Sequence, residues 1–332
     1  METVIRSYLQ ETRIGGRQDY KNLTVFPLLS AQAATLDYLT LDEALAANLI
    51  EITEIDAGGS VPELKLLNKS PRKVLIFDGE ELVGAKQNRI VNTTIIVAGK
   101  ATTVIPVSCV EAGRWSYKSA RFHSEQRIMS ADLRAMKARH VQESVRASGQ
   151  FLSNQGAIWE GIDEKARRMK AVSPSMAMSE IYQRQVPSLQ EYTARFEAVA
   201  EQVGAVFVIN GKVVGLDSFG NPETFSKMSG KLLASYALDA IDWLDPAKER
   251  LQVEESQAVE LLDGCKAASV ESRASVGLGT DCRLGADGLT GFALVLDGQV
   301  LHLAAFSGGR KTAGSPGDSK MSRFSARRRS RL

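Results

Sequence analysis

The sequence of 332 residues predicts an α+β fold, with a mostly antiparallel sheet first, a helical segment in the middle, and β-hairpins with one helix toward the C-terminus. Three observations support this class. Strand-like runs dominate residues 1–120, good helix formers dominate residues 124–202, and hairpin signals return over residues 204–306. The balance of 44% hydrophobic and 24% charged residues is that of an ordinary globular protein. We therefore expect one domain over residues 1–306, followed by a basic tail over residues 307–332.

The β-rich part consists of short runs of β-branched residues, each bounded by Gly, Pro or Asn. The predicted strands are residues 22–29, 49–55, 63–68, 73–77, 89–98 and 102–107. Along the second run the side chains alternate, so that Ile50, Ile52 and Glu54 share one face of the strand. This alternation is typical of a half-buried antiparallel sheet.

Helices are predicted where Ala, Met, Arg, Glu and Gln accumulate in a helical period. The predicted helices cover residues 39–49, 124–146, 154–172, 173–185, 187–202 and 222–243. Thr40 or Asp42 can cap the first, and Ser173 followed by proline can begin the fourth. An Asn-Gly pair between two apolar runs predicts a hairpin over residues 204–219, and residues 274–306 are predicted as strands with Gly turns.

Composition argues against membrane and secreted classes. No window approaches the roughly 18 consecutive apolar residues of a membrane span, and the N-terminus lacks the apolar segment of a secretory signal. Cys109, Cys265 and Cys282 lie far apart and form no CxxC motif, which indicates reduced thiols and no structural zinc site. We therefore predict a cytoplasmic protein without a membrane partner, and no residue is assigned as a metal ligand. The metal requirement, the cofactor and the oligomeric state stay open.

The C-terminal tail differs in charge from the rest of the chain. Residues 307–332 carry eight basic residues and one acidic residue, whereas the whole chain has a net charge of only +2, so the body is mildly acidic. The tail has few apolar residues and is predicted to be disordered. Such a tail can contact nucleic acid weakly and without sequence preference, or it can be solvated without a specific partner.

The densest polar cluster lies at residues 78–94, directly after an apolar strand. Its candidate site residues are Glu80, Glu81, Lys86, Gln87, Asn88, Arg89 and Asn92. Arg89 can hold a phosphate or carboxylate through two hydrogen bonds, and Glu80 or Glu81 can act as a general base. The amides offer further recognition. The alternative is a charged hairpin loop solvated by water, with local pairing of Glu and Lys.

A second cluster lies at residues 104–119, where Cys109, Glu111, Arg114 and Trp115 follow the end of a strand. A nucleophilic cysteine needs a base or a positive field, and no histidine has a suitable placement, so a buried and inert Cys109 is the preferred interpretation. Trp115 can stack on a base or a sugar, or it can pack on the core.

Two other features are interpreted structurally. The Gly-rich residues 277–288 lack the GK[ST] ending of a phosphate loop and open no convincing helix, so hairpin turns explain them better. His302 stands in an apolar run and is predicted to be a core or sheet histidine with its hydrogen bonds satisfied.

Two strings, DGEELVGAKQNRIVN (residues 78–92) and PVSCVEAGRW (residues 106–115), resemble a prokaryotic family, the ARG and rhodanese-phosphatase-superfamily-associated protein domain. FVINGKVVGLDSFG, KLLASYAL and GLGTDCRL are also similar to it, and the resemblance covers most of residues 10–306. The family is named for its association with genes of ADP-ribosylglycohydrolases and rhodanese-phosphatases, which implies a role near ADP-ribose or NAD-derived metabolites. At matching positions the resemblance implies these candidate site residues: Glu80, Glu81, Lys86, Gln87, Asn88, Arg89, Asn92, Cys109, Glu111, Arg114 and Trp115.

The leading hypothesis is a cytoplasmic protein that binds an ADP-ribose- or NAD-derived nucleotide, with hydrolysis as a further activity. Arg89 and Arg114 would hold phosphate and Trp115 would stack on a ring. Glu80, Glu81 and Glu111 would be the catalytic carboxylates. The alternative is a non-catalytic interaction module that docks a protein partner on the polar surface of residues 78–115. A third hypothesis is nucleic-acid binding through the basic tail.

Overall fold

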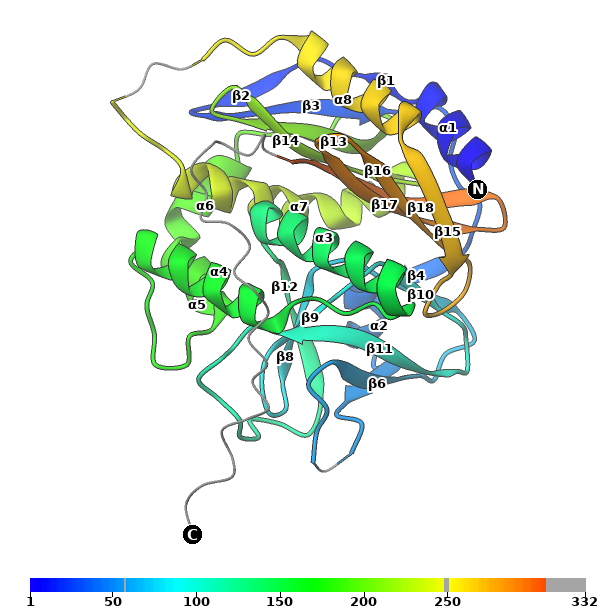
Figure 1. Ribbon diagram of the computed structural model, residues 1–332, viewed down its shortest axis with the longest axis vertical. Helices are drawn as coiled ribbons and strands as arrows, with labels where there is room; N and C mark the ends of the chain where they lie inside the picture. Colours follow the sequence, from blue (N-terminus) through cyan, green and yellow to red (C-terminus); the bar gives the residue numbers. More distant parts are fainter. Residues whose placement is uncertain (57, 248–250, 309–332) are drawn as a thin grey trace.

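The computed structural model describes residues 1–56, 58–247 and 251–308 (Figure 1). The predicted tail at residues 307–332 lies outside the described residues from position 309 onward. The elements of the described part confirm the predicted α+β class. No helix within these ranges combines the length and the apolar character needed to cross a membrane.

Among the described residues, the largest sheet has nine strands, all paired antiparallel. They are β1 (Arg13–Ile14), β2 (Gln18–Tyr20), β3 (Leu23–Leu29), β13 (Gln202–Ile209), β14 (Lys212–Phe219), β15 (Ser269–Ala274), β16 (Thr280–Ala286), β17 (Leu289–Leu296) and β18 (Gln299–Ser307). Their order is β1-β3-β13-β14-β18-β17-β16-β15, with β2 paired to β3. Asn210 and Gly211 connect β13 to β14 with φ angles of 50° and 73°, which confirms the predicted hairpin.

Helices cover both faces of this sheet (Figure 1). One face carries α1 (Glu2–Glu11) and α8 (Glu255–Ala267), and the other carries α3 (Ala131–Ser148) and α7 (Pro222–Asp242). Next to α3 and α7 lie α4 (Gln155–Arg168), α5 (Met178–Arg184) and α6 (Val186–Thr193). Because side chains alternate along β13, Val206 and Val208 join the core under α1 and α8, whereas Phe207 joins the core under α7.

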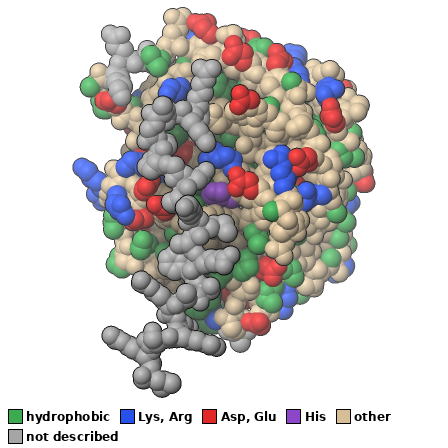
Figure 2. Space-filling model, in the orientation of Figure 1, with side chains coloured by type: hydrophobic (Ala, Val, Ile, Leu, Met, Phe, Trp, Pro, Cys, Tyr) green, Lys and Arg blue, Asp and Glu red, His purple; other side chains and the backbone are tan. Residues whose placement is uncertain are grey.

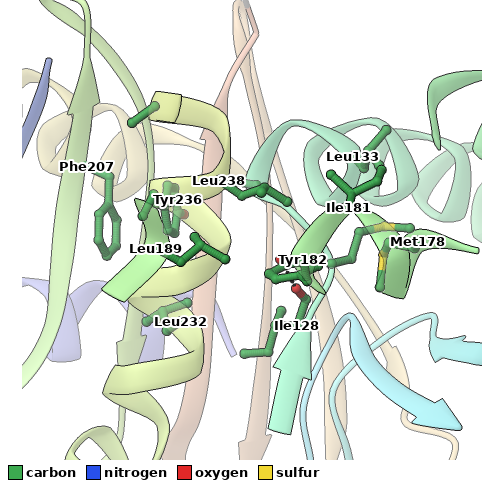
Figure 3. Packing of buried hydrophobic residues seen from close by; sticks show 14 of the residues in the cluster. Ile128, Leu133, Met178, Ile181, Tyr182, Leu189, Phe207, Leu232, Tyr236 and Leu238 are labelled. Atoms are coloured by element: carbon green, nitrogen blue, oxygen red, sulfur yellow. Dashed lines mark hydrogen bonds between the residues drawn. The ribbon is translucent and has the colours of Figure 1, made fainter. Parts of the chain in front are cut away.

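The core under α7 is the largest apolar cluster, and Figure 3 shows part of it. Phe207 lies parallel to Tyr236 of α7 with 3.6 Å between the ring centroids. Tyr182 of α5 lies close to Ile128, and its hydroxyl donates a hydrogen bond to the Ile128 carbonyl (Figure 3). This cluster therefore joins the large sheet to the small sheets that follow.

Two smaller sheets form the lower part of the molecule in Figure 1. Their strands are β4 (Tyr38–Thr40), β5 (Ile50–Thr53), β6 (Glu63–Asn68), β7 (Lys73–Ile76), β8 (Glu80–Gly84), β9 (Arg89–Val91), β10 (Ile95–Val97), β11 (Thr102–Cys109) and β12 (Phe122–Ile128). One sheet has the order β10-β7-β4, and β4 is parallel to β7. The other has the order β12-β8-β9-β11-β6-β5. It curls until its edge strands β5 and β12 are in contact, and Glu51 Oε1 lies 3.1 Å from Arg121 Nε there.

Several predicted elements differ from the structure. The helix predicted over residues 124–146 is wrong at its start, because β12 pairs with β8 there and α3 begins only at Ala131. The run over residues 89–98 is split into β9 and β10, which belong to different sheets. The helix predicted over residues 39–49 is shorter, as α2 (Leu41–Ala46), and Thr40 caps it in a capping box with Glu43.

A buried ionic network connects α3 to both parts of the fold. Arg134 Nη1 and Nη2 donate hydrogen bonds of 3.0 and 2.7 Å to the Asp217 carboxylate of β14, and its Nε lies 3.2 Å from Asp78 Oδ2. Lys137, one turn later, is paired with Asp78. These four side chains are 1% exposed or less. Burial raises the pKa of the Asp217 carboxyl, but the charges and hydrogen bonds of Arg134 and His302 outweigh it and bring the pKa to about 2.

His302 of β18 belongs to the same network. Its Nε2 lies 3.1 Å from Asp217 Oδ1 and its Nδ1 lies 2.7 Å from Thr94 Oγ1. The ring is fully buried between Phe77, Phe219 and Phe292. The prediction of a satisfied core histidine is therefore confirmed, and this closed arrangement stabilises the fold.

Candidate functional site

The two polar clusters predicted from the sequence meet in space. β9 pairs with β11, so that Arg89 lies opposite Cys109. Beyond the strand ends, Asn88 N–H donates a hydrogen bond of 3.1 Å to Glu111 Oε2, and Val110 N–H donates to the Asn88 carbonyl at 3.0 Å. The loops that follow β8 and β11 are therefore held together at one end of the six-stranded sheet.

Arg89 is the central side chain of this region, and it is fully buried. Its Nη1 donates hydrogen bonds to the Gln87 carbonyl at 3.3 Å and to Gln87 Oε1 at 3.1 Å. Its Nε and Nη2 are buried and make no hydrogen bond. Burial lowers the pKa of the Arg89 guanidinium below its ordinary value. A buried cation with two unused donors is costly, because desolvation is not offset by hydrogen bonds.

The closest carboxylate to these donors is Glu54, which follows β5. Its Oε1 lies 3.8 Å from Arg89 Nη2, beyond hydrogen-bond distance, and accepts a long hydrogen bond of 3.4 Å from Lys86 N–H. Its Oε2 is buried without a hydrogen-bond partner. Glu54 is not among the residues predicted for the site, although its alternation with Ile50 and Ile52 places it on the same strand face.

Two aromatic rings border this region at the surface. Trp115 is 49% exposed and Tyr117 is 53% exposed. The Arg89 Cζ atom lies 5.7 Å from the centre of the Trp115 ring, and Lys86 Nζ lies 5.4 and 5.3 Å from the centres of the two rings. Lys86 Nζ also donates a hydrogen bond of 2.6 Å to the Gly58 carbonyl. Exposed aromatic rings next to cations form a surface on which a planar group can stack.

Arg114 holds the loop that carries Trp115. Its Nη2 donates to Glu111 Oε2 at 2.7 Å and to Asn88 Oδ1 at 3.2 Å, and its Nη1 donates to the carbonyls of Ala85 and Ser116. Its Nε has no hydrogen-bond partner. We use the name Arg89 site for Glu54, Lys86, Arg89, Arg114, Trp115 and Tyr117.

Three of the predicted site residues, Glu80, Glu81 and Asn92, do not contribute their side chains to the Arg89 site. Glu80 pairs with Lys231 of α7 and accepts a hydrogen bond from Phe77 N–H. Glu81 pairs with Arg127 at 2.7 Å. Because Glu81 lies opposite Ile90 and Leu82 lies opposite Arg89, the side chains of Glu81 and Arg89 point to opposite faces of the hairpin.

Burial raises the pKa of both carboxyls, Glu80 and Glu81. Asn92 is also buried away from the site, where it accepts a hydrogen bond from Ser108 and donates one to the Phe151 carbonyl. The structure thus brings together Lys86, Gln87, Asn88, Arg89, Glu111, Arg114 and Trp115, but not Glu80, Glu81 and Asn92.

Unpaired buried polar atoms concentrate at the Arg89 site. In the described ranges, ten buried side-chain nitrogen and oxygen atoms have no hydrogen-bond partner, and four of them belong to Glu54, Arg89 and Arg114. Native proteins leave few such atoms unpaired, so each cluster needs an explanation, such as a ligand or ordered water. No group of three His, Cys, Asp or Glu residues suited to a metal ion occurs in the described part of the chain.

Two hollows lie elsewhere on the described structure. A groove of about 400 Å³ lies beside α1 and is lined by Thr3, Ser7, Glu11, Gln32 and Gln299 among others. A smaller, mostly apolar pocket of about 120 Å³ lies beside α7 and includes Phe196, Phe207 and Phe225. Neither contains a buried side-chain atom that lacks a partner, so the Arg89 site is the better candidate for a polar ligand.

Cys109 lies beside Arg89, and burial raises the pKa of its thiol to about 11. Cys265 and Cys282 are also buried, and burial raises the pKa of each thiol. We therefore expect none of the three thiols to react with Ellman's reagent at pH 8 in the native protein. All three should react at once after unfolding in guanidinium chloride. Rapid reaction of one native thiol would show that Cys109 or another cysteine is accessible and activated.

Residues 11–306 match the family model of the ARG and Rhodanese-Phosphatase-superfamily-associated Protein domain. No curated protein and no solved structure matches the chain. The match includes every residue of the Arg89 site and both strings of residues 78–92 and 106–115. The chain therefore belongs to the ARG and Rhodanese-Phosphatase-superfamily-associated Protein domain family.

Proposed function

We propose that this protein binds an anionic nucleotide of the ADP-ribose or NAD-derived class at the Arg89 site. The observation that carries this proposal is the fully buried Arg89 guanidinium, whose Nε and Nη2 make no hydrogen bond within the protein. A phosphate accepts two parallel hydrogen bonds from a guanidinium, so it would complete the pairing that the protein leaves open.

The charges and rings of the site support the same ligand class. Lys86, Arg89 and Arg114 contribute three cations, against the carboxylates of Glu54 and Glu111. The balance is positive and favours an anion. Trp115 and Tyr117 offer exposed rings beside these cations, and a base stacked on such a ring gains about 1–3 kcal/mol. A nucleotide combines the anion and the planar ring in one molecule.

Hydrolysis of the bound nucleotide is the further part of this proposal. Of the three predicted carboxylates, Glu111 is the one held next to the site, through Asn88 and Arg114. An assay for products released from bound ADP-ribose tests this part separately from binding.

The structure offers less support for the other two hypotheses. Most polar side chains of the predicted docking surface are buried. Among them, Glu80, Glu81 and Asn92 already bond to other residues of the folded chain. Where Figure 2 shows described residues, basic and acidic side chains are interspersed. The tail hypothesis concerns residues that lie mostly outside the described ranges.

Titration of the full chain with ADP-ribose, NAD and AMP tests the proposal. At about 100 times the dissociation constant, a ligand should add about 2.7 kcal/mol to the free energy of unfolding, which corresponds to a rise in melting temperature of roughly 5–10 °C. Trp115→Ala should weaken binding about 10- to 100-fold, because the stacking surface is lost.

Folding is not at risk in Trp115→Ala, because half of the side chain is already exposed. Val172→Ala, at another exposed position, is the control and should bind like the wild type. Absence of binding for all three ligands would exclude the proposed class.

A further inference from the structure

The free carboxylate oxygen of Glu54 sets a second requirement on the ligand. The Glu54 side chain is 4% exposed, and its Oε2 is buried without any hydrogen-bond donor. A buried carboxylate oxygen of this kind is costly unless a donor reaches it. Arg89 does not supply that donor, because its nearest nitrogen lies 3.8 Å from the other oxygen, Oε1.

A glycine lies next to this oxygen. Gly59 has a φ of 74°, and a Cβ atom added to it would lie 3.4 Å from Glu54 Oε2, 3.2 Å from Lys86 Cδ and 3.5 Å from Lys86 Nζ. Another residue at this position would be strained, and its side chain would contact the free oxygen.

Unused donors and an unused acceptor thus lie side by side. Arg89 offers Nε and Nη2, and Glu54 offers Oε2. An anion alone would pair with Arg89 but would place its negative charge next to the Glu54 carboxylate, which is unfavourable. A ligand that satisfies both residues must present an anionic acceptor and a hydrogen-bond donor within a few ångströms of each other.

We propose that Glu54 accepts a hydrogen bond from a ribose hydroxyl of the nucleotide while Arg89 holds its anionic group, so that Glu54 selects ribonucleotides over deoxyribonucleotides. This inference rests on the proposed function. In that ligand class the phosphate accepts hydrogen bonds and the ribose hydroxyls donate them. A buried group that must be satisfied by a ligand hydroxyl rejects an analogue that lacks the hydroxyl, because the group is then left unpaired.

The experiment compares AMP, 2′-deoxy-AMP, 3′-deoxy-AMP and IMP by calorimetric titration of the full chain. Wild type should bind AMP about 10- to 100-fold more tightly than at least one of the deoxy analogues. Glu54→Gln should weaken AMP binding and leave that deoxy analogue unchanged or bound more tightly, because the repulsion of the carboxylate is removed. This opposite response separates a contact with the hydroxyl from a structural role, which would weaken both ligands alike.

Glu51→Gln, on β5 three residues before Glu54 and partly exposed in its pairs with Lys69 and Arg121, is the matched control and should keep the discrimination of the wild type. Denaturation of each variant checks its folding.

Equal affinity of the wild type for AMP and both deoxy analogues would overturn the inference and leave the proposed function intact. If the wild type distinguishes AMP from IMP and Glu54→Gln does not, Glu54 contacts the base and the inference of a ribose contact is wrong. Absence of binding for all four ligands would overturn the proposed function as well.

Discussion

Arg134→Met should lower the free energy of unfolding by about 3–5 kcal/mol, the cost of removing one partner from a buried ion pair. Arg134 neutralises Asp217 through two hydrogen bonds and also contacts Asp78, and all three side chains are almost fully buried. Without the guanidinium, two carboxylates would remain in the core with only Lys137, His302 and Tyr236 near them. Unfolding in urea, followed by circular dichroism, measures the change.

The control for this prediction is Arg146→Met on the same helix. Arg146 also contacts a carboxylate through two hydrogen bonds, but both it and Glu271 are about half exposed. An exposed pair contributes about 1 kcal/mol or less, so this variant should unfold almost like the wild type. Similar losses in the two variants would show that burial does not decide the strength of the Arg134 network.

The double variant Arg89→Met/Glu54→Met should abolish nucleotide binding and leave the free energy of unfolding unchanged or raise it. These two side chains are almost as buried as Arg134 and Asp217, but their charges are 3.8 Å apart and three of their polar atoms have no hydrogen bond. Replacing a buried ion pair by apolar residues of similar size is often neutral or stabilising by about 1–4 kcal/mol. Loss of binding together with a gain in stability is expected when the replaced residues serve to bind a ligand and not to stabilise the fold.

Thermal unfolding and calorimetric titration of the same samples measure both effects. The matched control is Lys69→Met/Glu51→Met, a partly exposed pair between β5 and the residue after β6, which should keep binding and change stability by about 1 kcal/mol or less. If the Arg89 double variant unfolds several kcal/mol more easily than the wild type, the pair is structural and the proposed site is wrong.

The order of strands, helices and hairpins could be predicted because it depends on local patterns. The strand at residues 122–128 could not, since its Glu, Gln and Arg residues favour a helix and only pairing with β8 makes it a strand. The break between β9 and β10 has a similar cause. Thr93 and Thr94 bond to Asp281 and His302, which are distant in the sequence.

Part of the candidate site could also be predicted from the sequence. Arg89 and Trp115 stood out because of their residue types and their place after strands. Glu80 and Glu81 are neighbours in the sequence, but neighbours in a strand point to opposite faces and therefore do not serve one site. Glu54 carried a usable signal, because a carboxylate in line with Ile50 and Ile52 on an apolar face is expected to be buried.

The position of β18 has a consequence for synthesis of the protein. This strand is the last described element, yet it lies inside the large sheet between β14 and β17, and its His302 bonds to Thr94. A nascent chain therefore lacks a central strand of the sheet and one side of its ionic network until β18 has left the ribosome. Contacts of such long sequence separation form slowly, and the unpaired edges of β14 and β17 are exposed to aggregation until β18 is in place.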